Sequence, residues 1–207
     1  MSSESRFPEQ QEKERGTLNM SDGSVYAGEL KEGLPHGQGV LTMSPEENYT
    51  GEWREGRFHG QGILQAAKIH YQGEFRDGKF HGLGLATYPD GSRHMGEFRQ
   101  GSPHGQGHTV FADGNEYTGE FKMGKFHGWG LLVLTGGGKY EGEWREGFCH
   151  GQGTLIYTDG GEYRGEWRGG KRHGDGTMLF ADGQVATGEW KDDLFIGNRQ
   201  TEDTTIN

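Results

Sequence analysis

The chain has 207 residues, of which 41 are glycine, and only 29% belong to the hydrophobic set. Aromatic residues make up 12% of the chain, which excludes the aromatic-poor composition of a disordered protein and predicts a fold with thin, aromatic packing. The net charge of −10 argues against nucleic acid and anionic membranes as partners, and the single cysteine, Cys149, excludes a disulfide within these residues.

The two ends of the chain differ in composition from its middle. The first residues, MSSESRFPEQQEKER, lack the apolar core of a secretory signal. No apolar stretch has the length of a transmembrane helix. We therefore expect a cytoplasmic protein with disordered tails at residues 1–15 and 198–207.

Residues 16–197 are predicted to form an array of repeats, because a Gly-Glu pair recurs every 22 or 23 residues. The pairs begin at Gly28, Gly51, Gly73, Gly96, Gly119, Gly142, Gly165 and Gly188. We count a half repeat, seven full repeats and a partial capping repeat, in which Ile196 replaces the usual histidine. Atypical ends are expected, since a repeat array must stop its open edges from recruiting further strands.

Each repeat contains two strand candidates separated by glycine-bearing turns. The first has the form of YTGEWR at residues 49–54, and the second follows His-Gly-x-Gly, as in GTLIYT at residues 153–158. A PDG, ADG or TDG sequence, typical of a hairpin turn, often follows the second strand. No segment has sustained helical periodicity, so we predict an all-β, elongated, single-layer antiparallel meander of hairpins.

Alternation along the strands predicts two different faces for this sheet. Tyr49, Gly51 and Trp53 share one face, where glycine would allow a neighbouring ring to lie flat on the backbone. Glu52 and Arg54 share the other face, and equivalent acidic and basic residues recur in every repeat. We expect the second face to be a solvated charge ladder.

The sequence supports a structural role for these repeated residues better than a metal-binding, phosphate-binding or catalytic role. Histidines in equivalent positions would lie two strands apart, roughly 10 Å, which is too far to share a zinc ion. His-Gly-x-Gly precedes a strand, whereas a phosphate loop opens a helix. An active site needs different residues at one place, not identical copies. We therefore predict no metal, no cofactor and no catalytic residue, and expect each histidine to close its hairpin turn by hydrogen bonding.

The pattern resembles the MORN repeat (membrane occupation and recognition nexus), whose signature Y-x-G-x-[WF]-x-x-G-x-x-x-G-x-G is met by residues 49–62 and 140–153. Leu30, His94 and Ala186 depart from its aromatic positions. The resemblance implies an elongated single-layer sheet, a groove lined by the signature aromatics, and relatives that include axonemal radial spoke head proteins and adaptors. The partner-binding residues that it implies are Tyr49, Trp53, Tyr71, Phe75, Phe98, Tyr117, Phe121, Tyr140, Trp144, Tyr163 and Trp167.

We expect a non-enzymatic scaffold or adaptor that binds a helix or extended peptide of a protein partner along this aromatic face. A one-layer sheet has no second layer to cover such a face, and exposed apolar surface usually marks an interaction site. The family resemblance suggests a cytoskeletal or ciliary, flagellar or axonemal assembly. The alternatives are a phosphoinositide or membrane adaptor, which the net charge disfavours, a targeting module for an enzyme in another chain, and a homodimer.

Overall fold

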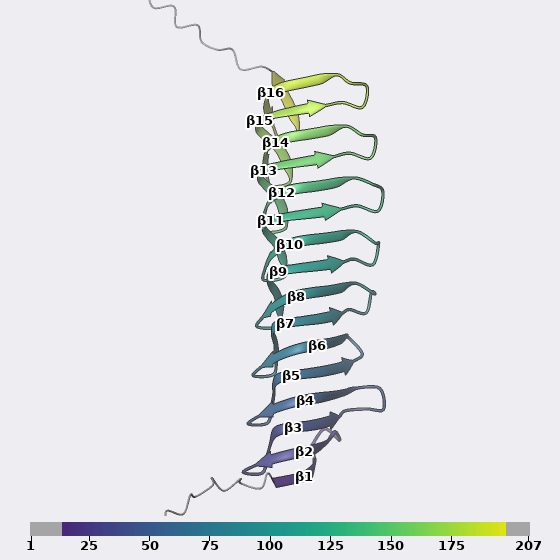
Figure 1. Cartoon of the computed structure of the whole chain (residues 1–207), viewed down its shortest axis with the longest axis vertical. Coiled ribbons are helices and arrows are strands. Elements are labelled where there is room, and N and C mark those ends of the chain that lie inside the picture. The colour runs from purple at the N-terminus through teal and green to yellow at the C-terminus, as the bar shows by residue number, and fades with distance from the viewer. Residues whose placement is uncertain (1–13, 198–207) are drawn as a thin grey trace, which may run out of the picture. The chain divides into compact units, whose positions relative to one another are not determined.

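The computed structural model describes residues 14–197, which fall into two compact units divided between Lys79 and Phe80. Every regular element among these residues is a β-strand (Figure 1). The predicted tails lie outside the described residues, except for Glu14 and Arg15, which begin the first strand. The repeat array thus starts two residues earlier than predicted.

The first unit is an antiparallel meander in which each strand pairs with the next one in the chain. Its strands are β1 (Glu14–Asn19), β2 (Val25–Lys31), β3 (Leu34–Thr42), β4 (Asn48–Arg54), β5 (Arg57–Ala66) and β6 (Ile69–Arg76).

The second unit continues the same pattern, from β7, whose first residue still belongs to the first unit, to β17. Its strands are β7 (Lys79–Thr87), β8 (Arg93–Arg99), β9 (Ser102–Val110), β10 (Glu116–Lys122), β11 (Lys125–Val133), β12 (Lys139–Arg145), β13 (Phe148–Ile156), β14 (Glu162–Arg168), β15 (Lys171–Leu179), β16 (Val185–Lys191) and β17 (Leu194–Gly197). The predicted all-β antiparallel meander is confirmed within each unit.

A tight two-residue turn joins the two strands of each repeat. Met123 and Gly124 have φ angles of 51° and 76°, and the same pair of positive angles recurs at the equivalent turns. Two consecutive positive φ angles define a type I′ turn, whose twist matches that of the flanking strands. Glycine occupies the second position in all but the last of these turns, where Asp193 has a φ of 72°.

The positive φ angle at the first turn position strains a residue that carries a side chain. A substitution that tolerates this φ angle should relieve the strain. Met123 is 73% exposed, so its side chain contributes little packing to offset the left-handed backbone. We expect Met123→Asn to raise the free energy of unfolding by about 0.5–1 kcal/mol, because asparagine tolerates this conformation. Urea denaturation followed by circular dichroism measures the change. Met95→Asn, at an exposed strand position, is the control and should not stabilise the protein.

In repeats of both units, an irregularity interrupts the ladder at the Gly-Glu pair. In β4 and β5, Gly51 pairs with Gly62 but Glu52 pairs with His59, so Gly60 and Gln61 are extra residues on the second strand. The Glu52 carboxylate accepts a hydrogen bond of 2.8 Å from the Gln61 amide and thereby replaces the missing ladder bond. This bulge bends the strand locally.

The repeated glutamates are thus more than members of a solvated charge ladder. The carboxylates of Glu97, Glu143 and Glu166 accept a hydrogen bond from the equivalent amide in their own repeats. The glycine after each histidine leaves room for this carboxylate. A Cβ on Gly60 would lie 2.3 Å from the Glu52 carboxyl carbon. Its φ of 52° adds a second reason for glycine at this position.

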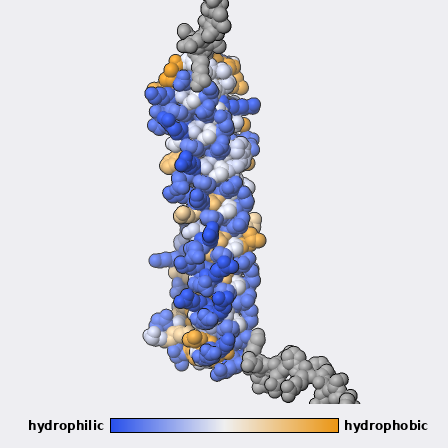
Figure 2. All heavy atoms as spheres, turned by 90° about the vertical axis from the view of Figure 1, so that its left-hand side faces the viewer, coloured by the Kyte–Doolittle hydropathy of each residue, from blue (hydrophilic) through white to orange (hydrophobic). Residues whose placement is uncertain are grey.

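The side of the molecule shown in Figure 2 is mainly hydrophilic, with hydrophobic residues in separate spots. None of the described residues forms a helix with the length and apolarity needed to cross a membrane.

Candidate functional site

A row of aromatic side chains lies on one face of each meander. Tyr140 illustrates the arrangement: its ring meets the edge of Trp144, four residues on, at 4.9 Å and that of Trp167, in the next repeat, at 5.2 Å. The Tyr140 hydroxyl donates a hydrogen bond of 3.0 Å to the Glu143 carbonyl. Edge-to-face contacts of this kind add about 0.5–1.5 kcal/mol per pair to the burial of the rings.

The glycines of the strands let these rings approach the backbone, as predicted. A Cβ on Gly153 would lie 2.3 Å from the Tyr140 hydroxyl, and one on Gly142 would lie 2.5 Å from the Gly153 Cα. The indole nitrogen of Trp144 donates a hydrogen bond of 3.1 Å to the Gly130 carbonyl. Glycine therefore provides both the space for the rings and the acceptor for the indole.

The burial of these rings corrects the expectation of an uncovered aromatic face. The predicted partner-binding residues are between 0% and 6% exposed: Tyr49, Trp53, Tyr71, Phe75, Phe98, Tyr117, Phe121, Tyr140, Trp144, Tyr163 and Trp167. The described residues contain no helix or second sheet that could cover the rings. The rings cover one another, because they pack edge to face along the row and lie flat on glycine backbone.

A second aromatic position, just before the repeated histidine, completes this cover in some repeats. Phe58 stacks on Tyr49 at 3.8 Å between ring centroids, and Phe126 stacks on Tyr117 at 3.7 Å. We call this the stacking position. From β9 onward, the other residues at this position are Pro103, Cys149, Arg172 and Phe195.

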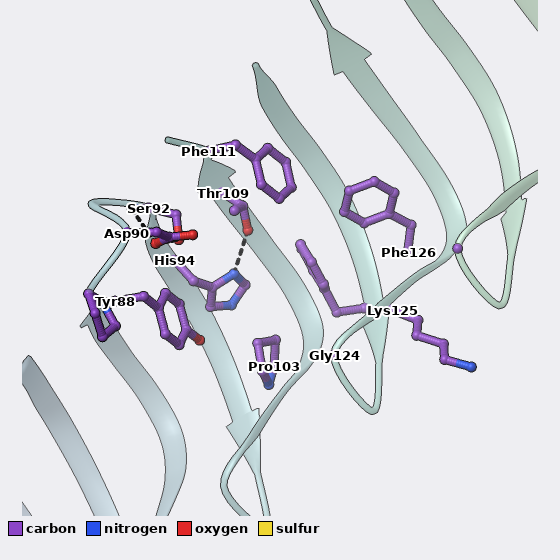
Figure 3. A pocket seen from close by; sticks show the side chains of 13 residues that line it. Tyr88, Asp90, Ser92, His94, Pro103, Thr109, Phe111, Gly124, Lys125 and Phe126 are labelled. Carbon is purple, nitrogen blue, oxygen red and sulfur yellow. Dashed lines mark hydrogen bonds between the residues drawn. The ribbon is translucent and has the colours of Figure 1, made fainter. Parts of the chain in front are cut away.

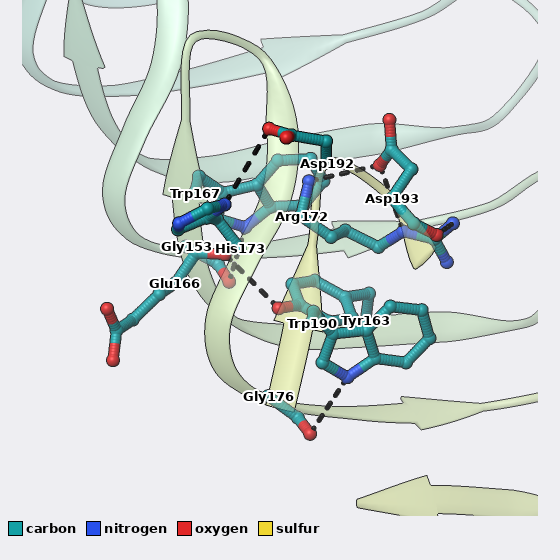
Figure 4. A network of polar contacts seen from close by, with 10 residues as sticks. All are labelled: Gly153, Tyr163, Glu166, Trp167, Arg172, His173, Gly176, Trp190, Asp192 and Asp193. Atoms are coloured by element: carbon teal, nitrogen blue, oxygen red, sulfur yellow. Dashed lines mark hydrogen bonds and ion pairs between the residues drawn. The ribbon is translucent and has the colours of Figure 1, made fainter. Parts of the chain in front are cut away.

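Arg172 shows how a non-aromatic residue can take the stacking position (Figure 4). Its guanidinium lies 4.5 Å from the centre of the Trp190 ring and 5.8 Å from that of Tyr163. Its Nε donates a hydrogen bond of 3.1 Å to the Asp193 carboxylate. Cys149 takes the same position two strands earlier, and burial raises the pKa of its thiol to about 12, so the thiol stays protonated at neutral pH.

One repeat of the second unit lacks both rings of the stack. His94 takes the place of tyrosine, and Pro103 takes the stacking position. The two cross-strand neighbours of His94 are Ala86 and Thr109, where Tyr49 has Leu41 and Leu64. The side chains at four positions, His94 and three around it, are therefore smaller or more polar than those at the equivalent positions in the repeat of Tyr49.

A groove lies over this point, with a volume of about 770 Å³ (Figure 3). His94, Thr109 and Phe121 are buried, while Tyr88, Phe111 and Phe126 are half-buried. The residues that line the groove are Tyr88, Pro89, Asp90, Ser92, His94, Pro103, Thr109, Phe111, Phe121, Gly124, Lys125, Phe126 and Gly147. Only Phe121 of the predicted partner-binding residues is among them.

His94 is held in a defined orientation beneath the groove. Its Nδ1 shares a hydrogen bond of 2.8 Å with the Thr109 hydroxyl, and Phe98 and Phe121 contact its edges at 5.1 and 4.7 Å. Burial lowers the pKa of His94 to about 4, with a smaller contribution from His108, so the ring is neutral at physiological pH. Its Nε2 is buried and has no hydrogen-bond partner among the described residues.

Two charged residues, Asp90 and Lys125, line the groove, and both are already engaged. The Asp90 carboxylate accepts hydrogen bonds from the amide and hydroxyl of Ser92, which lower its pKa. Lys125 forms an ion pair of 3.2 Å with Glu146. Because Lys125 is paired with Glu146, no cation among the residues that line the groove remains to neutralise the Asp90 carboxylate.

The repeated histidines only partly fulfil their expected role in closing the hairpin turns. His59 accepts a long hydrogen bond of 3.5 Å from the Asp77 amide. The Nδ1 atoms of His127 and His173 are buried without a hydrogen bond from any described residue, although His173 lies 3.7 Å from the Asp192 carboxylate. No group of three or more histidine, cysteine, aspartate or glutamate side chains in residues 14–197 is arranged to hold a metal ion.

Comparison with protein families gives a match to the model described as "MORN repeat". The seven matched segments correspond to the seven predicted full repeats and cover more than half of the chain: residues 26–44, 49–68, 71–93, 94–116, 117–139, 140–162 and 163–185. Comparison with curated protein sequences gives no significant match.

Solved structures similar to this chain include two domains in complex with peptides. The TCP10 domain of Danio rerio CPAP, in complex with a peptide of STIL, is 13% identical, with 85% of this chain and 84% of that chain covered and a TM-score of 0.45. The SAS-4 (dCPAP) TCP domain of Drosophila melanogaster, in complex with a proline-rich motif of Ana2, is 11% identical, with 86% and 90% covered and a TM-score of 0.38.

Proposed function

We propose, from the premise that the chain belongs to the MORN repeat family, that it is a non-enzymatic scaffold that binds a protein partner. The observation that supports this proposal is the groove over His94, where the aromatic row is interrupted and Tyr88, Phe111 and Phe126 remain half-buried. Grooves of this size and apolar character are typical ligand and peptide sites.

In this proposal, only one of the eleven signature aromatics predicted to bind the partner contacts it directly. Phe121 lines the groove and would contact the partner directly. The other ten rings do not line the groove and are buried within the aromatic row of their own unit. The cytoskeletal or ciliary setting is part of the proposal and rests only on the resemblance to axonemal members of the family.

A variant that restores the ring stack tests this function without damaging the fold. We expect His94→Tyr with Pro103→Phe to fill the groove in the way that Tyr117 and Phe126 fill their repeat. The added aromatic contact should raise the free energy of unfolding by about 1–2 kcal/mol. Proximity labelling in cells that express the native protein, read by mass spectrometry, should show partners that the wild type captures and this variant loses.

The matched control is Cys149→Phe, which adds the same ring at the stacking position two repeats further on, outside the groove. This variant should retain every partner of the wild type. Equal labelling by the wild type and the groove-filled variant, with the latter folded and at least as stable, would contradict the proposed function.

A further inference from the structure

The groove over His94 lies where two other repeats have a stacked phenylalanine ring. The missing ring indicates what kind of group could occupy the groove. In the repeats of Tyr49 and Tyr117, a phenylalanine ring stacks nearly parallel to the tyrosine, with interplanar angles of 14° and 8°. Phe58 reaches this place from a position paired with Trp53, and Pro103 occupies the equivalent position, paired with Phe98. The space above His94 is therefore the space of a flat ring.

The surroundings of His94 preserve the geometry that a stacked ring needs. Phe98 and Phe121 contact the imidazole edge to face, as Trp53 and Phe75 contact Tyr49. A Cβ on Gly107 would lie 2.5 Å from His94 Cε1, which shows that the imidazole lies against the backbone of β9. The hydrogen bond to Thr109 then restrains the ring. One face of the imidazole is covered by backbone, and the residue as a whole is only 1% exposed, so His94 forms the floor of the groove and a ring from outside the repeat would lie above it.

The charges at the groove favour a basic segment as the carrier of that ring. Asp90 lies at one end of the groove and Asp113 lies two residues beyond Phe111, which also lines it. Lys125 is neutralised by Glu146, and the chain as a whole has a net charge of −10. Complementary charge at the rim of a site increases the association rate and selects among partners.

The C-terminal residues of the chain do not match this chemistry. Residues 198–207 contain no aromatic residue. A partner segment fits the groove better than this tail.

Resting on the proposed function, we infer that the groove binds an extended segment of a partner protein through one aromatic side chain flanked by lysine or arginine. The ring enters the groove above His94 and lies among Tyr88, Pro103, Phe111 and Phe126. The flanking basic residues pair with Asp90 and Asp113. The chain thus recruits from its partner the ring that its own repeat lacks.

Synthetic peptides of defined chemistry test this inference on the full chain. The probes are short, dye-labelled peptides with a central tryptophan flanked by lysines, a second with leucine in place of tryptophan, and a third with glutamate in place of lysine. Fluorescence anisotropy should show that the first binds about 10-fold more tightly than either of the others. The groove-filled variant His94→Tyr, Pro103→Phe should bind the first peptide about 10-fold or more weakly, while Cys149→Phe binds it like the wild type.

Two further variants complete the test. One examines the charge of Asp90 separately from the aromatic ring of the peptide, and the other examines whether the chain's own N-terminal residues occupy the groove. Asp90→Asn retains a carbonyl oxygen that can accept the Ser92 hydrogen bonds, and it should reduce the preference for lysine over glutamate without removing that for tryptophan over leucine. Phe7→Ala should leave the affinity unchanged. A rise in affinity in that variant would identify the chain's own N-terminal residues, which include Arg6 and Phe7, as the occupant and would overturn the inference.

Binding of all three peptides with equal affinity, undiminished binding to the groove-filled variant, or no binding of any peptide would also overturn the inference. Each of these outcomes is distinct from failure of the proposed function. Partners that proximity labelling finds with the wild type but not with the groove-filled variant would still establish the groove as a docking site for another chemistry.

Discussion

Replacing Trp144 by alanine is expected to lower the free energy of unfolding by about 3–5 kcal/mol, the cost typical of removing a buried tryptophan. Trp144 is 6% exposed, and its ring contacts Tyr117, Phe126 and Tyr140 edge to face. The substitution also removes the hydrogen bond from the indole nitrogen to the Gly130 carbonyl. Urea denaturation followed by tyrosine fluorescence and circular dichroism measures the loss.

Trp129→Ala is the matched control for this prediction, because the same change is made in the same unit. Trp129 is 53% exposed on the opposite face of the sheet, where it pairs with Glu143. Substitutions at such exposed positions usually change stability by no more than about 0.5 kcal/mol. Similar losses at Trp144 and Trp129 would show that the aromatic row does not form the hydrophobic core.

The repeats themselves made the fold predictable. A period of 22 or 23 residues, two strand candidates per period and a turn after each strand define a hairpin meander, and the structure has it in each unit. The glycines facing Tyr140 were also predictable, since a strand glycine beside aromatic residues indicates close contact between ring and backbone.

The prediction of an exposed aromatic face was wrong, because neighbouring rings cover one another even in a single-layer sheet. A single layer leaves one face open only if its side chains stand apart. Here the tyrosine of one repeat contacts the tryptophan or phenylalanine of its own repeat and of the next, as Tyr163 contacts Trp167 and Trp190. Large rings at this spacing bury one another without a second layer.

The groove over His94 was only partly foreseeable. His94 departs visibly from the tyrosine of the signature. The groove also depends on Pro103, which takes a position that the signature leaves open, and on Ala86 and Thr109, each of which lies two residues after the last glycine of a signature. Their joint effect follows from the register that places Ala86 and Thr109 on either side of His94.

Replacing Gly153 by alanine is expected to cost about 3 kcal/mol, at the upper end of the range for overpacked cores. The new Cβ would lie 2.3 Å from the Tyr140 hydroxyl oxygen and 2.6 Å from its Cζ. The ring cannot withdraw easily, since Trp144 and Trp167 contact it and its hydroxyl donates a hydrogen bond to the Glu143 carbonyl. Thermal and urea denaturation give the change in stability.

Gly136→Ala provides the control, because a Cβ at Gly136 would meet only the Thr158 methyl group, at an ordinary contact distance of 3.5 Å. That variant should be as stable as the wild type or gain up to about 1 kcal/mol from the lower entropy of its unfolded chain. Equal losses at Gly153 and Gly136 would mean that the glycines serve the strand conformation and not the approach of the ring.

The clash itself can be isolated with a double-mutant cycle between Gly153 and Tyr140. Tyr140→Phe removes the hydroxyl that lies closest to the new Cβ, at the cost of one hydrogen bond, about 1 kcal/mol. In the double variant, the loss of stability should be smaller than the sum of the two single losses by about 1 kcal/mol or more, because the hydroxyl is no longer there to be displaced. Strict additivity would contradict direct contact between the tyrosine ring and the glycine backbone, on which the packing of every repeat depends.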